Sequence, residues 1–100
     1  AVSGSGPAYY FLFMEAMMNK AKAFGFNEQD ATLLVKQTAL GACQMAMDSA
    51  DSVEQLRKNV TSPGGTTAAA IAEFERRQLR AIVEDALDAS IVRAQELSKI

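Results

Sequence analysis

The fold is decided by residues 7–24, which read PAYYFLFMEAMMNKAKAF. Pro7 suits the first turn of an α-helix, because its fixed φ and missing N–H are tolerated there. Only three residues of the stretch are charged, and its aromatic and methionine side chains cover every direction around a 3.6-residue period. We therefore expect a helix that is buried on most sides, with one face on its own core and another on a second chain or domain.

Residues 25–47 predict a second helix. Gly25 can end the first helix in the left-handed conformation, and Asn27, with Asp30 three residues later, can cap a helix over Glu28 to Met47. Two apolar lines at helical spacing indicate an oligomer. The first line is Ala31, Leu34, Val35, Thr38, Ala42, Met45 and Ala46, and the second, on another side, is Leu33, Leu40 and Met47.

Three further helices follow. Residues 52–55, Ser-Val-Glu-Gln, form a capping box at the start of a short helix that reaches about Val60. Residues 61–67 break this helix, residues 68–74 resume helical composition, and a last helix runs from Leu79 to about Leu97. No window alternates with period 2, so we expect an all-α helical bundle of about five helices, in a single domain over residues 1–100.

The composition fits a folded, soluble domain. The chain has 100 residues, of which 49% are hydrophobic and 22% charged, too apolar for disorder and too charged for a membrane segment. Ten basic against twelve acidic residues give a net charge of −2. Because no basic block stands out, we expect neither a nucleic-acid nor a membrane partner.

The histidine and cysteine counts exclude several kinds of site. With no His, imidazole bases, Ser/His/Asp sites and His-ligated metals are excluded. The single Cys43 forms no internal disulfide or thiolate cluster, and it fits a reducing, cytoplasmic location. On its Ala-rich helical face we expect Cys43 to be a small core residue.

The start of the chain resembles no signal peptide, and the missing initiator Met suggests a fragment or a processed chain.

The segment Thr61-Ser62-Pro63-Gly64-Gly65-Thr66-Thr67 is the strongest candidate for chemistry. Glycines and hydroxyls directly before a helix let backbone amides meet an anion at the positive end of the helix dipole. A nucleotide-phosphate loop is excluded, because no Lys follows the glycines and no strand precedes them. A carboxylate fits better. The alternative, a simple turn with capping hydroxyls, remains open at this point.

These residues resemble the pyrroline-5-carboxylate reductase family, in its C-terminal domain only. The resemblance covers nearly the whole chain and is most specific in Ser62 to Thr67. The other matching residues are Ser3 to Tyr9, Glu15-Ala16, Leu40 to Ala42, Leu56, Val60-Thr61, Phe74-Glu75, Leu79-Arg80 and Glu84 to Ala86.

The resemblance implies hydride transfer from NADPH or NADH to the C=N carbon of 1-pyrroline-5-carboxylate, which gives L-proline. An N-terminal Rossmann domain, absent from this chain, would bind the cofactor. The helical domain would interleave with a partner as a homodimer and could join a ring of dimers. Ser62, Gly64, Gly65, Thr66 and Thr67 would hold the substrate carboxylate, and Thr67 would contact the ring nitrogen as the catalytic residue.

Two residues depart from the family pattern. Lys58 stands where an acidic residue is common, and Gln78 stands where Gly is common. A left-handed Gln78 would cost about 1 kcal/mol or more relative to Gly. Two alternatives remain beside the reductase: a helical dimerisation module without a substrate, and another Rossmann-linked reductase.

Overall fold

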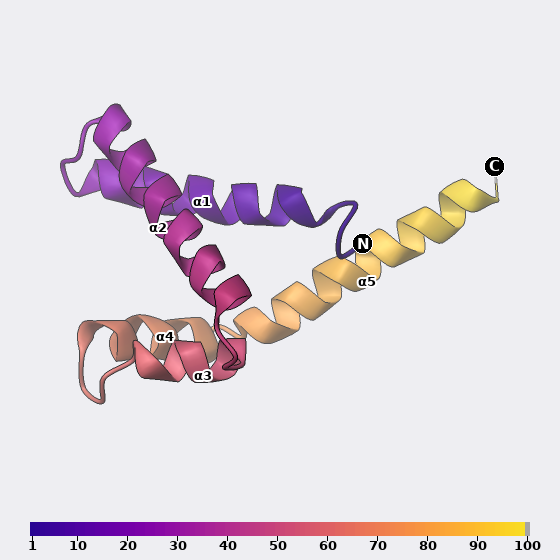
Figure 1. Cartoon of the computed structure of the whole chain (residues 1–100). Helices are drawn as coiled ribbons and strands as arrows, with labels where there is room; N and C mark the ends of the chain where they lie inside the picture. The colour runs from indigo at the N-terminus through magenta and orange to yellow at the C-terminus, as the bar shows by residue number, and fades with distance from the viewer. Residues whose placement is uncertain (100) are drawn as a thin grey trace. The chain divides into compact units, whose positions relative to one another are not determined.

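The structure is a computed structural model that describes residues 1–99. Within these residues it contains five α-helices and no strand: α1 (Gly6–Ala23), α2 (Glu28–Asp48), α3 (Val53–Asn59), α4 (Thr66–Arg76) and α5 (Leu79–Ser98) (Figure 1). The expected all-α class is confirmed. Each helix begins and ends within two residues of its predicted boundary, because caps, glycines and helical spacing are local signals.

The described chain divides into two compact units. One is residues 6–53, which hold α1 and α2, and the other joins residues 1–5 to the chain from Glu54 onward, which holds α3, α4 and α5.

The α1–α2 unit is a helical hairpin whose connection carries the predicted caps. Gly25 has φ +111°, and the amides of Gly25 and Phe26 donate to the carbonyls of Lys22 and Ala21 at 3.0 and 3.3 Å. This bonding pattern closes the end of α1 as a Schellman motif. Asn27 Oδ1 accepts from the Asp30 amide at 2.8 Å and caps α2.

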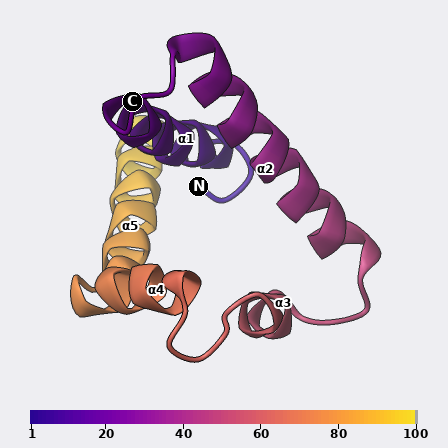
Figure 2. The ribbon, with the colours of Figure 1, turned by 90° about the vertical axis from the view of Figure 1, so that its left-hand side faces the viewer.

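The two helices of the hairpin diverge from the connection (Figures 1 and 2). Many of their large apolar side chains are exposed. Ala31 and Val35 are the buried apolar side chains of the described residues. On α1, Tyr10, Phe11 and Leu12 are 70%, 61% and 68% exposed. The predicted core stripe of α2 does face α1, but only its N-terminal part, at Ala31 and Val35, is buried within one chain.

Cys43 corrects one expectation. It is a free cysteine and is exposed, not a core residue. The side chain lines an apolar groove between α1 and α2, and this chain alone does not fill that groove. Helical spacing identifies the Ala-rich face of α2, but it does not show which surface packs on that face.

In the second unit, α4 and α5 meet at a junction set by Gln78. Its φ of 61° and ψ of 45° place this non-glycine residue in the left-handed region. Arg80 Nε donates to Glu75 Oε1 at 2.9 Å and joins the start of α5 to the end of α4. Hydrogen bonds from Arg76 and Arg77 to Glu73 hold the pKa of that carboxyl below its ordinary value.

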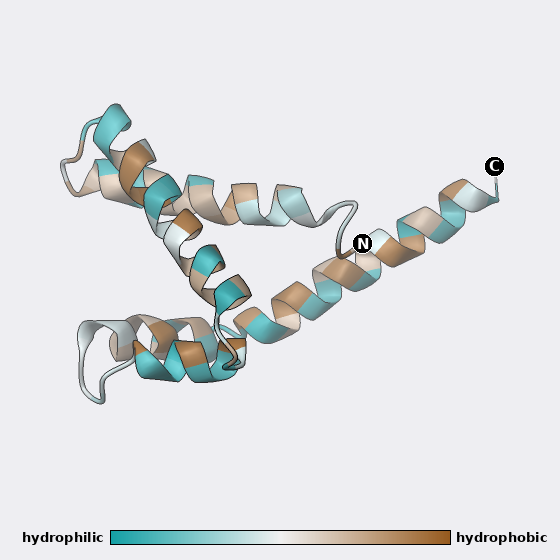
Figure 3. Ribbon diagram, viewed as in Figure 1, coloured by the Kyte–Doolittle hydropathy of each residue, from teal (hydrophilic) through white to brown (hydrophobic). Residues whose placement is uncertain are grey.

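Helix α5 runs from this junction with apolar residues spread along it (Figure 3). Ile82, Val83 and Val92 are each about half exposed. The N-terminal segment contacts α5, where the hydroxyls of Ser5 and Ser90 lie 3.4 Å apart. Among the helices described, none has the length and apolar character needed to cross a membrane.

Candidate functional site

The candidate loop lies between the end of α3 at Asn59 and the start of α4 at Thr66. Its centre is a turn in which the Gly65 amide donates to the Ser62 carbonyl at 3.0 Å. Pro63 occupies the second position of this turn, and Gly64, with φ +73°, occupies the third. Pro followed by a positive φ is the pattern of a type II turn, so the sequence Ser-Pro-Gly-Gly sets the shape of the loop locally.

Gly65 is the N-cap of α4, and its backbone is extended, with φ −87° and ψ −177°. A side chain there would be crowded by the backbone and not strained by φ, because a Cβ on Gly65 would lie 3.2 Å from the Ser62 carbonyl oxygen, closer than most Cβ contacts. The cap makes no side-chain hydrogen bond. The first turn of α4 therefore begins without the Ser, Thr, Asp or Asn side chain that normally occupies its amides.

Thr66 and Thr67 are the first two residues of α4, and both are exposed. The Ala69 amide makes the first helical bond, to the Gly65 carbonyl at 3.2 Å, so the amides of Thr66, Thr67 and Ala68 have no carbonyl within the helix to bind. These amides and the helix dipole together favour an anion. The structure thus brings five predicted residues together, in the type II turn and the first turn of α4 that follows it: Ser62, Gly64, Gly65, Thr66 and Thr67.

Thr61 was not among the predicted site residues, although it fixes the start of the loop. Its Oγ1 donates to the Arg57 carbonyl at 2.5 Å and its amide donates to the Lys58 carbonyl at 3.1 Å. The available signal was a hydroxyl residue two positions after the end of a helix. Lys58 itself pairs with Glu54 at 3.0 Å, so its positive charge is partly neutralised within α3.

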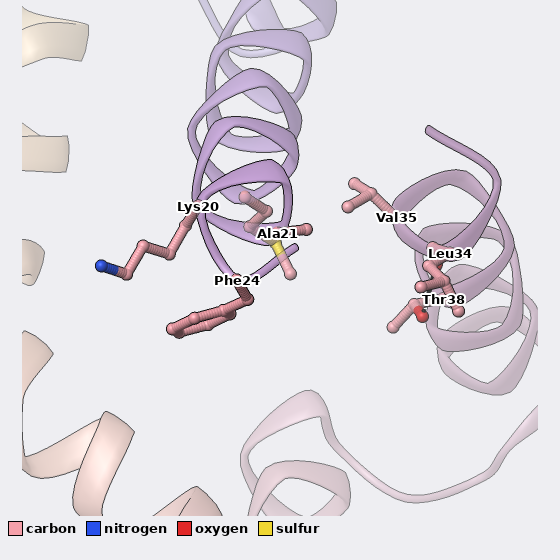
Figure 4. Close-up of a pocket in the computed structure, with 7 residues that line it drawn as sticks. Lys20, Ala21, Phe24, Leu34, Val35 and Thr38 are labelled. Carbon is pink, nitrogen blue, oxygen red and sulfur yellow. Dashed lines mark hydrogen bonds between the residues drawn. The ribbon is translucent and has the colours of Figure 1, made fainter. Parts of the chain in front are cut away.

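The groove between α1 and α2 is a second concave region, and it lacks converging polar groups. Figure 4 shows one part, where Leu34, Val35 and Thr38 of α2 face α1 and the Lys20 ammonium lies apart from them. The adjoining part has a volume of about 470 Å³ and includes Phe13, Met14 and Met17. No group of three His, Cys, Asp or Glu that could hold a metal occurs within residues 1–99. The groove therefore has the character of a packing surface.

A family model described as pyrroline-5-carboxylate reductase dimerisation matches residues 1–97. The chain belongs to this family. The expectation drawn from the Ser62 to Thr67 signature is thereby confirmed at the level of the family. The match over residues 1–97 separates the chain from an unrelated helical module.

Curated relatives and solved structures agree with this family assignment. The chain is 50% identical over its whole length to a pyrroline-5-carboxylate reductase of Vibrio alginolyticus, covering 37% of that protein, and 50% identical over 99% of its length to one of Pseudomonas aeruginosa, covering 36%. A Coxiella burnetii pyrroline-5-carboxylate reductase structure matches 96% of the chain with a TM-score of 0.92 and 51% identity, over 36% of that protein. A Plasmodium falciparum pyrroline carboxylate reductase with NADP bound matches 88% with a TM-score of 0.85 and 35% identity, over 34% of its chain. The chain thus spans little more than a third of the length of these relatives.

Proposed function

We propose that this chain is the C-terminal domain of a pyrroline-5-carboxylate reductase, which reduces 1-pyrroline-5-carboxylate to L-proline in proline biosynthesis. The observation that carries the proposal is the Ser62 to Thr67 segment. It presents amides without a helical partner at the start of α4, where the N-cap residue, Gly65, has no side chain to bind them. Relatives at 50% identity that are named pyrroline-5-carboxylate reductase support it.

The turn is suited to the substrate carboxylate. Amides at the start of α4 and the hydroxyls of Ser62 and Thr66 supply donors, and the helix dipole favours the negative charge. Gly64 and Gly65 keep side chains away from the approach of the ligand. In our proposal Ser62, Gly64, Gly65, Thr66 and Thr67 form the carboxylate site.

In our proposal Thr67 is the catalytic residue and contacts the ring nitrogen of the substrate. Reduction adds a hydride to the carbon of the C=N bond, and the nitrogen keeps the proton of the iminium form or receives one as the amine forms. The Thr67 hydroxyl can hydrogen-bond the nitrogen in the orientation that exposes the carbon to the hydride, and it can pass on a proton. No His is needed for either role.

The cofactor, NADPH or NADH, supplies the hydride. Residues 1–99 contain no strand and so no βαβ unit for a dinucleotide. We therefore assign cofactor binding to a Rossmann domain N-terminal to Ala1, which agrees with a chain that covers 37% of its Vibrio relative. The NADP bound to the Plasmodium protein supports a nicotinamide cofactor for this one.

We also propose that the domain forms an interleaved homodimer, which can join a ring of dimers. In the α1–α2 unit the buried apolar side chains are Ala31 and Val35, whereas Tyr10, Phe11 and Leu12 of α1 are 70%, 61% and 68% exposed. Because the interfaces of obligate homodimers are large and apolar, these exposed side chains fit a surface that a partner chain would cover. A cytoplasmic location completes the proposal and suits the free thiol of Cys43.

The test of the site is Thr67→Ala in the full-length enzyme. We expect kcat/KM for pyrroline-5-carboxylate to fall about ten- to a hundredfold, the effect of one or two hydrogen bonds to a charged group at about 1.5–3 kcal/mol. The fold and the oligomeric state should not change. If Thr67 only stabilises the first turn of α4, the melting temperature will fall by a few degrees and kcat/KM will not change, and Thr67 is then not a site residue.

A further inference from the structure

Thr61 makes two hydrogen bonds to the end of α3, through different atoms. Its side-chain Oγ1 donates to the Arg57 carbonyl at 2.5 Å, and its backbone amide donates to the Lys58 carbonyl at 3.1 Å. The residue is half-buried, unlike the exposed Ser62 and Thr66 that follow. Both bonds therefore lie in a setting where loss of a donor is costly.

The side chain of Thr61 takes the place of a helical amide. In a continuing α-helix the amide of residue 61 would bind the carbonyl of residue 57, four positions earlier. Here the hydroxyl makes that bond, while the amide turns to the carbonyl three positions earlier. Two of the carbonyls that a helix end leaves unbonded are thereby satisfied, and α3 stops at Asn59.

This arrangement fixes one end of the substrate loop. Ser62 is the next residue and the first of the type II turn, whose carbonyl accepts from the Gly65 amide. The loop is thus attached to α3 through Thr61 and to α4 through the turn and the Gly65 cap. Only Pro63 and Gly64 lie between Ser62 and the Gly65 cap. A displacement of the Thr61 backbone therefore also moves the backbone amides of the turn.

We propose that Thr61 is a positioning residue for substrate-carboxylate binding, acting through its Oγ1 bond to the Arg57 carbonyl. The inference rests on the proposed function of the Ser62 to Thr67 turn. Thr61 does not contact the substrate in this account. It holds Ser62 and the turn in the geometry that the carboxylate requires, so its loss weakens binding more than it slows hydride transfer.

The test compares Thr61→Val and Thr61→Ser in the full-length enzyme. Val keeps the branched shape and removes the hydroxyl, and Ser keeps the hydroxyl. For Thr61→Val we expect the KM for pyrroline-5-carboxylate to rise about three- to tenfold, the range for one hydrogen bond, with kcat and the KM for NADPH within about twofold. Thr61→Ser should restore the KM to within about twofold of the parent enzyme.

Ser98→Ala is the matched control, because Ser98 Oγ also donates to a backbone carbonyl, that of Gln95 at 2.8 Å, near the end of α5. It should leave all three kinetic constants unchanged. If Thr61→Val does not fold, Thr61→Ala takes its place. Failure of both to fold, with Thr61→Ser folded, would give Thr61 a purely structural role and overturn the proposal.

Thr67→Ala, measured in the same series, separates the two proposals. If it lowers kcat/KM while Thr61→Val leaves the substrate KM unchanged, the positioning role of Thr61 is refuted and the site stands. A Thr61→Val enzyme in which kcat and both KM values change together, or a Thr61→Ser enzyme as impaired as Thr61→Val, refutes the role as well. If neither Thr67→Ala nor Thr61→Val alters the kinetics, the turn is not the substrate site and both proposals fall.

Discussion

At the scale of single residues, the two adjacent glycines of the loop serve different purposes. Gly64 needs a positive φ, and a Cβ there would meet nothing within 4 Å. Gly65 has an ordinary extended backbone, but a Cβ on it would lie 3.2 Å from the Ser62 carbonyl oxygen. The positive φ of the turn thus falls on Gly64, whereas a side chain on Gly65 would crowd the Ser62 carbonyl.

Gly65→Val should therefore harm the site more than Thr67→Ala does. The branched side chain would push the Ser62 carbonyl away and break the turn that holds the amides, so we expect kcat/KM to fall by more than about a hundredfold. Gly64→Asn is the matched comparison, because Asn tolerates the left-handed region and the space is open. Steady-state kinetics of both variants would contradict this account if Gly64→Asn were the more impaired.

Gln78 allows a stability prediction. It holds φ 61° without a side-chain cap bond, so Gln78→Gly should relieve about 1 kcal/mol of backbone strain. The melting temperature of residues 1–100 should rise by about 4–8 °C, the range for a domain of this length. Gln37→Gly, in the middle of α2, is the control and should lower it by a similar amount. A lower melting temperature for Gln78→Gly would show that the left-handed conformation carries no strain.

At the scale of the helices, the sequence predicts what is local. Gly25 and Asn27 mark the α1–α2 connection within one residue, and the Ser-Pro-Gly-Gly run predicts the break before α4. Cys43 and Thr61 show the limit. Helical spacing indicates that a face is apolar but not which surface covers it, and a hydroxyl after a helix shows no partner until the Arg57 carbonyl is placed.

Helix α1 carries the prediction for the interface. Phe13 and Met17 line the groove and are 46% and 42% exposed in the single chain. Phe13→Glu should unfold the domain or split the dimer, because an unpaired charge buried by the partner costs several kcal/mol. Asn19→Glu, on the same helix but outside the groove residues, is the control and should leave the sedimentation coefficient unchanged. A stable, well-folded dimer of Phe13→Glu would contradict an interface at this groove.

At the scale of the whole molecule, the described residues bury few apolar side chains within one chain. Its buried apolar residues are Ala31 and Val35, and a domain of this length normally buries well over half of the surface of its unfolded chain. The pattern of residues 7–24, apolar on every side, predicts that a second chain or domain covers one face of that helix. It does not predict what covers the groove between α1 and α2, because helical spacing does not show which surface packs on an apolar face.

The central claim is that this domain completes a pyrroline-5-carboxylate reductase, and it is tested most directly by turnover with and without the upstream domain. We expect the full-length protein to oxidise NADPH or NADH when pyrroline-5-carboxylate is added and to release proline in equal amount. Residues 1–100 alone should give no turnover, because the described chain holds no dinucleotide fold. A full-length protein that folds and dimerises but forms no proline with either cofactor would contradict the account, as would turnover by the isolated chain.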